Sequence, residues 1–235
     1  MRKQVLTINT LYMKRMLKVA CAAAIILLSF STAYGQINFG FKGGLNLSNV
    51  AFHTPVDNAP KVLPTFQAGG VVEWTLRDYL ALGAGLQLQS KGYQYKTSDD
   101  NYLIQHTVNP LYVQVPVQLI FHGGGVFGSF GPFAGFGVSG GSHKVQYTPR
   151  SSDGAARTQR SALHYGNGVD DDIAPFEFGG MVEFGYESKI GLRFTFSYQA
   201  GLSDWRPADR RDLLLDSKIA SRVASFCVTY MFGVK

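Results

Sequence analysis

The chain is poor in cysteine and in charge, and it has no apolar run long enough to cross a membrane as a helix. Charged residues make up 16% of its 235 residues, against 46% hydrophobic and 13% aromatic residues. This composition excludes a disordered chain and leaves room for one large β-rich domain. The longest apolar run, residues 19–30, is shorter than the roughly 20 residues that a transmembrane helix needs.

The formal net charge of +6 belongs almost entirely to the first 35 residues. Those residues contain no acidic side chain and five basic ones: Arg2, Lys3, Lys14, Arg15 and Lys18. The remaining chain therefore has 17 of the 22 basic residues against 16 acidic ones. A balance this even gives no support for a nucleic-acid partner.

The first 35 residues have the three parts of a secretory signal peptide. The basic residues precede the apolar run 19–30, and Ala33 and Gly35 then occupy the small-residue positions before a cleavage site. The prediction is a signal peptide over residues 1–35 and a mature domain over residues 36–235.

Neither cysteine is expected to carry a lipid or to form a disulfide. Cys21 lies at the start of the apolar run rather than after it, which argues against a lipoprotein signal. After cleavage the mature chain keeps only Cys227, so an internal disulfide is impossible.

Residues 176–202 show a two-residue alternation that indicates two long β-strands. One face of this segment carries Phe176, Phe178, Val182, Phe184, Tyr186, Leu192, Phe194, Phe196 and Tyr198. The other face carries Glu177, Glu183, Glu187, Arg193, Thr195, Ser197 and Gln199. A transmembrane barrel has such strands, with about ten residues crossing the bilayer, apolar groups toward lipid and polar groups inward.

Eight segments share this alternation, which predicts an all-β fold: an eight-stranded antiparallel up-and-down transmembrane β-barrel. The segments are 37–48, 65–76, 80–91, 111–121, 126–138, 176–187, 190–200 and 221–232. Short turns follow the second, fourth and sixth segments, and long loops without strand period are expected at 50–63, 97–106, 141–174 and 203–217. This alternation of loop lengths places both mature termini on the periplasmic side. A strand bulge is expected at Pro116, because proline donates no ladder hydrogen bond.

The inward face of the predicted barrel is expected to hold a polar network. Five charged residues have the inward parity: Lys42, Glu73, Lys91, Glu183 and Arg193. Opposite charges are expected to pair across the interior, since a buried ion without a partner is costly. Eight strands enclose a lumen that side chains fill, so the barrel is expected to conduct poorly.

Glycine-rich segments resemble two catalytic motifs. Residues 123–131 (GGGVFGSFG) resemble a phosphate-binding loop but lack its Gly-Lys-Ser/Thr ending. Residues 122–125 (HGGG) and 137–141 (GVSGG) resemble the oxyanion and nucleophile motifs of α/β-hydrolases, but a polar loop stands where the helix after the serine is needed. A turn followed by a strand is favoured at these segments.

The predicted long loops contain three groups that could bind or react. A cation could be held by the carboxylates of Asp170, Asp171 and Asp172. A metal site or lipid hydrolysis could use the loop histidines and nearby serines, namely His53, His106, His143, His164, Ser142 and Ser161. Lipopolysaccharide phosphates could contact Arg150, Arg157 and Arg160. Ordinary solvated loops are favoured in each case, and the chain is expected to be no enzyme and to need no metal or cofactor.

Several blocks resemble the PorT-like, porin-family outer-membrane β-barrel domain. They are FGFKGGLNLSN near the mature start, YVQVPVQL, GPFAGFG, and FGGMVEFGYE followed by GLRFTFSYQAGLSD. The resemblance covers essentially all of residues 36–235 and implies an outer-membrane location. The family's namesake is associated with a protein-secretion system, so the resemblance also implies a possible link to secretion.

The last predicted strand carries alternate residues expected to face lipid: Phe226, Val228, Tyr230 and Phe232. By resemblance to barrel proteins in general, the barrel-assembly machinery would read this segment as an insertion signal.

The functional expectation is an interaction barrel whose surface loops bind a partner. The expected partners are outer-membrane lipid, the barrel-assembly machinery and a protein bound through the loop 141–174. Two alternatives stay open, a small-solute diffusion porin and an outer-membrane lipid-modifying enzyme.

Overall fold

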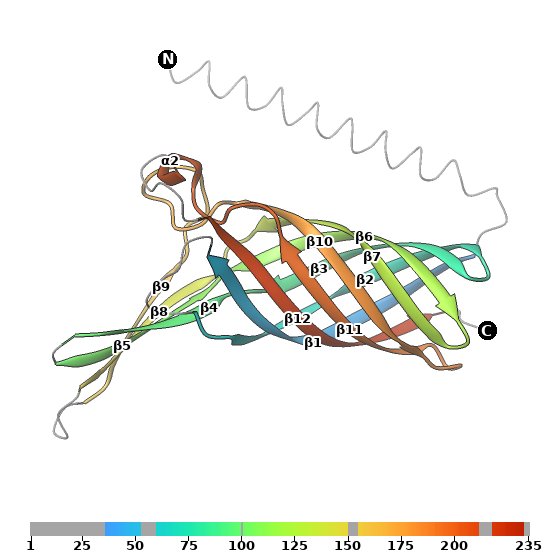
Figure 1. Ribbon diagram of the computed structural model, residues 1–235, viewed down its shortest axis with the longest axis horizontal. Coiled ribbons are helices and arrows are strands. Elements are labelled where there is room, and N and C mark those ends of the chain that lie inside the picture. The colour runs from blue at the N-terminus through green and yellow to red at the C-terminus, as the bar shows by residue number, and fades with distance from the viewer. Residues whose placement is uncertain (1–35, 53–59, 100, 150–154, 212–217, 233–235) are drawn as a thin grey trace, which may run out of the picture. The chain divides into compact units, whose positions relative to one another are not determined.

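The computed structural model describes residues 36–52, 60–99, 101–149, 155–211 and 218–232. Eight antiparallel strands form a closed barrel in the order β1-β12-β11-β10-β7-β6-β3-β2 (Figure 1). Their bounds are β1 (Ile37–Phe52), β2 (Leu63–Arg77), β3 (Leu80–Ser90), β6 (Leu111–Gly123), β7 (Val126–Gly137), β10 (Phe176–Glu187), β11 (Leu192–Gly201) and β12 (Ile219–Phe232). The predicted eight-stranded barrel is confirmed. The predicted signal peptide lies outside the described residues.

Side chains alternate between the outer wall and the interior along every barrel strand. In β1, Phe41 is 69% exposed while the next residue, Lys42, is 6% exposed. The register carries this alternation to the next strand, since Phe41 lies opposite Tyr230 and Lys42 lies opposite Thr229. The two-residue period of a strand therefore sorts apolar residues outward and polar residues inward around the whole barrel.

The barrel is closed by pairing its first strand with its last. The β1–β12 ladder runs from Phe39 opposite Phe232 to Phe52 opposite Ile219 and contains 14 residue pairs. Closure removes the unpaired backbone groups that an open sheet edge would present, which a hydrocarbon environment could not satisfy.

Pro116 interrupts a ladder without producing the expected bulge. Its side chain is buried on the interior face of β6. The β3–β6 register is the same on both sides of it, with Ala84 opposite Val117 and Gln87 opposite Gln114. The bulge prediction is wrong because the missing N–H leaves a gap in the ladder and no extra residue is inserted. A register shift occurs instead between Thr75 and Arg77, at the end of β2.

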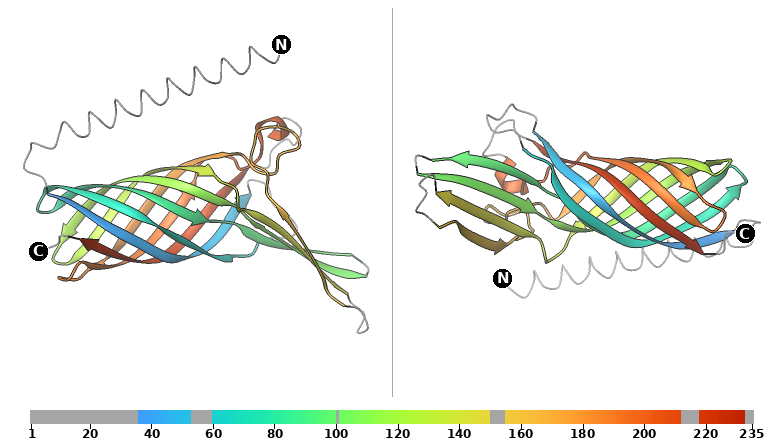
Figure 2. Two further views of the ribbon diagram at one scale, coloured as in Figure 1. Left: turned by 180° about the vertical axis from the view of Figure 1, so that it is seen from behind. Right: turned by 90° about the horizontal axis from the view of Figure 1, so that it is seen from below.

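A second, four-stranded antiparallel sheet lies within two connections that were expected to be loops. It has the order β4-β5-β8-β9 and is built from β4 (Tyr93–Ser98), β5 (Tyr102–Asn109), β8 (Ser142–Pro149) and β9 (Arg157–Ala162). Figure 2 shows these strands following directly from barrel strands β3 and β7. The loop predictions for 97–106 and 141–174 are therefore wrong. One face of this sheet is polar, and the other mixes tyrosines with histidine, threonine and serine, so its strands lack the uniformly apolar outer face that marks the barrel strands.

A buried apolar cluster packs where the second sheet meets the barrel. Its buried members are Val50, Tyr112, Leu163, Ile173 and Trp205. The Tyr112 ring stacks on Trp205 and meets Tyr165 edge-on, with centroid separations of 6.0 Å in both cases. The cluster joins the β11–β12 connection, which includes the short helix α2 (Ala208–Arg211), to the barrel rim. No helix among the described residues is long and apolar enough to cross a membrane.

Candidate functional site

The five charged residues predicted for the interior all lie there. Their exposed fractions range from 0% for Lys91 to 8% for Glu183. The register explains this placement, because each residue has the interior parity of its strand. The residues separate into two groups along the barrel, one around Arg193 and one around Lys91.

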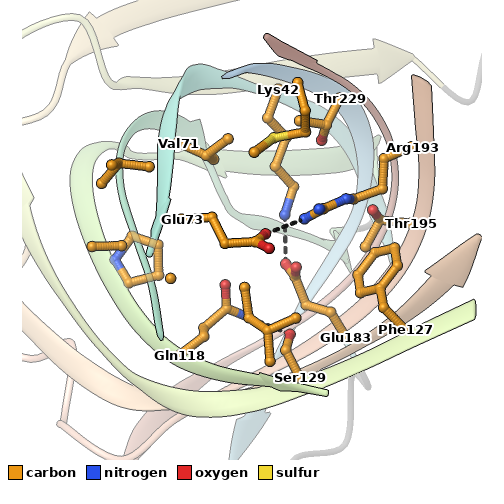
Figure 3. A pocket seen from close by; sticks show the side chains of 16 residues that line it. Lys42, Val71, Glu73, Gln118, Phe127, Ser129, Glu183, Arg193, Thr195 and Thr229 are labelled. Carbon is orange, nitrogen blue, oxygen red and sulfur yellow. Dashed lines mark hydrogen bonds and ion pairs between the residues drawn. The ribbon is translucent and has the colours of Figure 1, made fainter. Parts of the chain in front are cut away.

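The first group contains the ion pairs of Lys42 and Arg193. Lys42 Nζ lies 2.5 Å from Glu183 Oε1, and Arg193 Nη1 lies 2.8 Å from Glu73 Oε2. Figure 3 shows these four side chains converging from opposite walls of the barrel. Arg193 Nη2 also donates to Glu187 Oε2 at 2.8 Å, so the guanidinium bridges two carboxylates.

His122 extends this first group toward the β6–β7 turn. Its Nε2 lies 2.9 Å from Glu73 Oε1, and its Nδ1 lies 3.8 Å from Glu187 Oε2. The guanidinium of Arg193 lies 4.7 Å from the centroid of the Phe127 ring, which adds a cation–π contact. Every charge of this group therefore has a partner of opposite sign or an aromatic face.

The second group is centred on Lys91, which is fully buried. Its Nζ donates to Glu177 Oε2 and to Gln114 Oε1, both at 2.8 Å, and lies 4.5 Å from the centroid of the Phe133 ring. The hydroxyl of Ser221 donates to the other carboxylate oxygen of Glu177. The buried pair of Lys91, which directly follows β3, and Glu177 of β10 is thus completed by three further side chains, from β6, β7 and β12.

Three ionisable members of the network were not among the predicted site residues: Glu177, Glu187 and His122. The two glutamates share the inward parity of Glu183 on one strand, so the alternation could have revealed them. The sequence gives no such signal for His122, because this residue precedes three glycines and is predicted to lie in a turn.

Side chains fill the interior, which leaves little free volume. An interior cavity of about 30 Å³ lies among the residues of the first group, including Lys42, Glu73 and Arg193. That volume is comparable to the share of one water molecule in the liquid. The aromatic cluster of Tyr112 and Trp205 fills the interior at the rim nearest the second sheet.

The predicted lipid-facing residues of β12 lie on the outer wall. Phe226, Val228, Tyr230 and Phe232 are 38–56% exposed. Tyr230 and Phe232 meet edge-on at 5.1 Å between ring centroids, and Phe41 meets Phe232 at 5.8 Å. The intervening residue Thr229 is 3% exposed and faces the interior.

The second sheet has one basic face. This face carries Lys96, Lys144 and Arg160, whereas Arg157 lies opposite Tyr147 on the other face. The four strands contain no aspartate or glutamate. Lys144 lies directly opposite Arg160 in the β8–β9 ladder. Lys96 is on the same face. It lies opposite Gln105, and Gln105 lies opposite Gln146. Gln146 is two residues from Lys144 in β8, so its side chain leaves the sheet on the same side as that of Lys144.

The other face of the second sheet is aromatic and contains two of the histidines noted in the sequence. The His106 ring stacks on Tyr95 at 4.6 Å, and His106 Nδ1 lies 3.4 Å from His143 Nε2. Burial, followed by the neighbouring His143, lowers the pKa of His106. Protonation of His106 therefore disfavours the folded sheet, whose stability falls as the pH drops below the ordinary histidine range.

The remaining sequence candidates have structural roles or lie outside the described residues. Asp171 accepts a hydrogen bond from the Gly168 N–H, and Asp172 accepts one from the His164 N–H. Ser161 lies opposite His143 in the β8–β9 ladder. No group of three or more His, Cys, Asp or Glu side chains suited to a metal occurs within the described part of the chain. The described residues do not include His53 and Arg150.

The glycine-rich segments form ordinary hairpin structure. Gly124 and Gly125 have φ angles of +62° and +91°, which the tight β6–β7 turn requires and which other residues rarely adopt. The residues that follow, from Val126, form β7 rather than a helix.

Comparison with known proteins identifies the family of this barrel. The family model of the outer membrane protein beta-barrel domain matches residues 29–205. The chain belongs to this family. It is an outer-membrane β-barrel protein. No curated protein matches the chain.

Several solved outer-membrane proteins resemble the barrel at low sequence identity. One is Ail, the attachment invasion locus protein of Yersinia pestis, whose structure was solved with the heparin analogue sucrose octasulfate. Ail is 11% identical to this chain, and the match covers 84% of this chain and 99% of Ail, with a TM-score of 0.42. Neisserial surface protein A is 9% identical over 82% of this chain and 96% of its own, with a TM-score of 0.40. OprG from Pseudomonas aeruginosa is 13% identical over 83% and 95%, with a TM-score of 0.30.

Proposed function

We propose that this outer-membrane barrel is an interaction protein, in which the barrel holds the second sheet in place for binding an acidic protein partner. The PorT-like resemblance of the sequence supports a role for that interaction in protein secretion. With both mature termini in the periplasm, the second sheet lies on the outer side of the membrane.

The observation that carries this proposal is the unbalanced charge of the second sheet. Like charges placed directly opposite each other in a sheet destabilise it, yet Lys144 faces Arg160 with no carboxylate in any of the four strands. The repulsion between these like charges works against folding of the sheet. An anionic surface bound to this face would offset that repulsion. Acidic protein surfaces fit this basic face by charge complementarity.

The rigidity of the support favours recognition of a protein. Binding residues carried on strands lose less conformational entropy on binding than those on a mobile loop. Here the basic face is held by three antiparallel ladders that begin beside barrel strands. The filled interior, in turn, gives no support to the alternative of a small-solute porin.

A crosslinking pull-down from intact outer membranes tests the proposal. The double variant Lys144→Gln, Arg160→Gln should lose the partners that the wild-type chain captures, because the paired charges are removed without deleting the sheet. The variant Lys189→Gln is the matched control, since Lys189 is an exposed lysine of the β10–β11 turn. Deleting residues 145–170 should also abolish capture and reduce secretion while the barrel remains folded. An unchanged set of captured proteins in the double variant would contradict the proposal.

A further inference from the structure

The outer wall of the barrel has a shallow groove where three neighbouring strands carry small side chains. Pro132, Gly180 and Ala200 lie side by side on β7, β10 and β11. A Cβ atom placed on Gly180 would have no neighbour within 4 Å, so this part of the wall is open. Bulkier residues flank the row, with Phe130, Val182, Tyr198 and Leu202 between 44% and 56% exposed.

The groove is large enough for a hydrocarbon chain. Its volume is about 600 Å³, and its lining is almost entirely apolar. A second hollow of about 430 Å³ adjoins it at Leu202 and is lined by Phe176, Phe178 and Lys218 among others. Both volumes fall within the range of small-molecule binding sites.

Two cations lie at the rim end of the groove. On the next strand, β12, the position opposite Ala200 is occupied by Arg222. The row of small residues therefore ends at a cation. Arg222 Nη1 donates to the Gly201 carbonyl oxygen at 3.0 Å, and Lys218 Nζ donates to the next carbonyl oxygen, that of Leu202, at 2.5 Å. The two cations therefore both bind backbone oxygens at the end of β11.

The charge environment of this rim favours an anion. The nearby carboxylate of Asp204 is already engaged, since Arg206 Nη2 lies 2.8 Å from its Oδ2 and the Ile219 N–H donates to its Oδ1. An outward cation in a lipid-facing wall is costly within the hydrocarbon region, so Arg222 belongs at the level of the lipid headgroups. Phosphate oxygens there would be strong acceptors for the guanidinium and the ammonium.

We propose that the groove binds lipid A, with an acyl chain along Gly180 and Ala200 and a phosphate on Lys218 and Arg222. The apolar groove suits an acyl chain, the partly polar hollow beside it suits the start of a headgroup, and the two cations suit its phosphate. With the mature termini in the periplasm, this rim lies in the outer leaflet, where lipid A is the phosphorylated lipid. This site is separate from the basic face of the second sheet.

Native mass spectrometry of the purified barrel in detergent tests the groove, with lipid A, dephosphorylated lipid A and phosphatidylglycerol as probes. The variant Gly180→Leu should weaken lipid A binding by about tenfold, which corresponds to about 1.4 kcal/mol. Gly43→Leu is the matched control, because Gly43 is an outward glycine of β1 whose added Cβ would also meet no atom within 4 Å. If Gly180→Leu does not fold, judged by heat-modifiable gel mobility, Ala200→Leu fills the same groove from β11.

The headgroup contact has its own variants. Lys218→Gln combined with Arg222→Gln should remove the preference for lipid A over its dephosphorylated form, while Lys189→Gln at the opposite rim should keep it. Undiminished lipid A binding by the groove-filling variants would overturn the site. Equal binding of phosphatidylglycerol and lipid A by the wild-type barrel would overturn the assignment of lipid A as its ligand.

Discussion

At the scale of single residues, Lys91 shows how the barrel interior holds a charge away from water. Its ammonium has a carboxylate, an amide oxygen and an aromatic face within reach, supplied by Glu177, Gln114 and Phe133. Removing two ions from water costs several kcal/mol, and only well-placed partners offset that cost. The pair therefore constrains how strands β3, β6, β7 and β10 are arranged, whatever its net contribution to stability.

The variant Lys91→Met is expected to destabilise the barrel by about 3–5 kcal/mol, because it leaves the buried Glu177 carboxylate without its cation. Urea unfolding in detergent, followed by heat-modifiable gel mobility, measures this loss. The double variant Lys91→Met, Glu177→Gln should recover much of the stability, since no uncompensated charge remains. Lys189→Met, at an exposed turn position, should be silent. A Lys91→Met protein as stable as the wild type would show that Glu177 is accommodated without Lys91.

Parity along a strand predicts which residues enter the interior but not which of them meet. Lys42 and Glu183 are separated by 141 residues in the chain, and only the barrel register brings them together. Glu177 had the correct parity as well, yet nothing in its local sequence connects it with Lys91. The up-and-down pattern gives the order of the strands, but pairing across the interior also depends on the stagger between strands, which the alternation does not reveal.

At the scale of elements, the strands that could be predicted are those whose two faces meet different environments. In β10 one face meets lipid and the other meets the polar interior, so Phe184 and Glu183 differ sharply in type. The second sheet lacks this contrast. In β4, tyrosines alternate with Gln94 and Lys96, and neither face has an apolar period strong enough to indicate a strand.

Strand β12 is an element whose two faces should respond oppositely to the same substitution. Tyr230→Asp and Phe232→Asp each place a carboxylate against lipid, at a cost below the roughly 2–4 kcal/mol of an arginine or lysine at the bilayer centre and smaller still near its surfaces. Thr229→Asp instead enters the interior opposite Lys42 and Arg193, where two cations can receive it. Heat-modifiable mobility after expression should show reduced assembly for the first two variants and nearly normal assembly for the third. Equal assembly of all three would contradict the assigned faces of this strand.

At the scale of the whole molecule, the ion pairs and the aromatic cluster occupy the interior of the barrel. The interior cavity of about 30 Å³ is far smaller than the water-filled lumen of a large porin.

Purified barrels in planar bilayers are therefore expected to give no stable, large conductance steps. A wide porin reconstituted in the same bilayers is the positive control. Stable large steps from this protein would favour the alternative of a small-solute porin over the proposed interaction role.

The pairing of the first strand with the last has a consequence for how this protein is made. Residues at the start of β1 pair with β2 on one side, but their partners on the other side lie near Phe232 and become available only after almost the whole chain has been synthesised and exported. Until then, both strands at the seam present open edges and the aromatic outer wall faces water. The exported chain must therefore be shielded from aggregation during its passage, and final closure must wait for the last strand rather than proceed along with export.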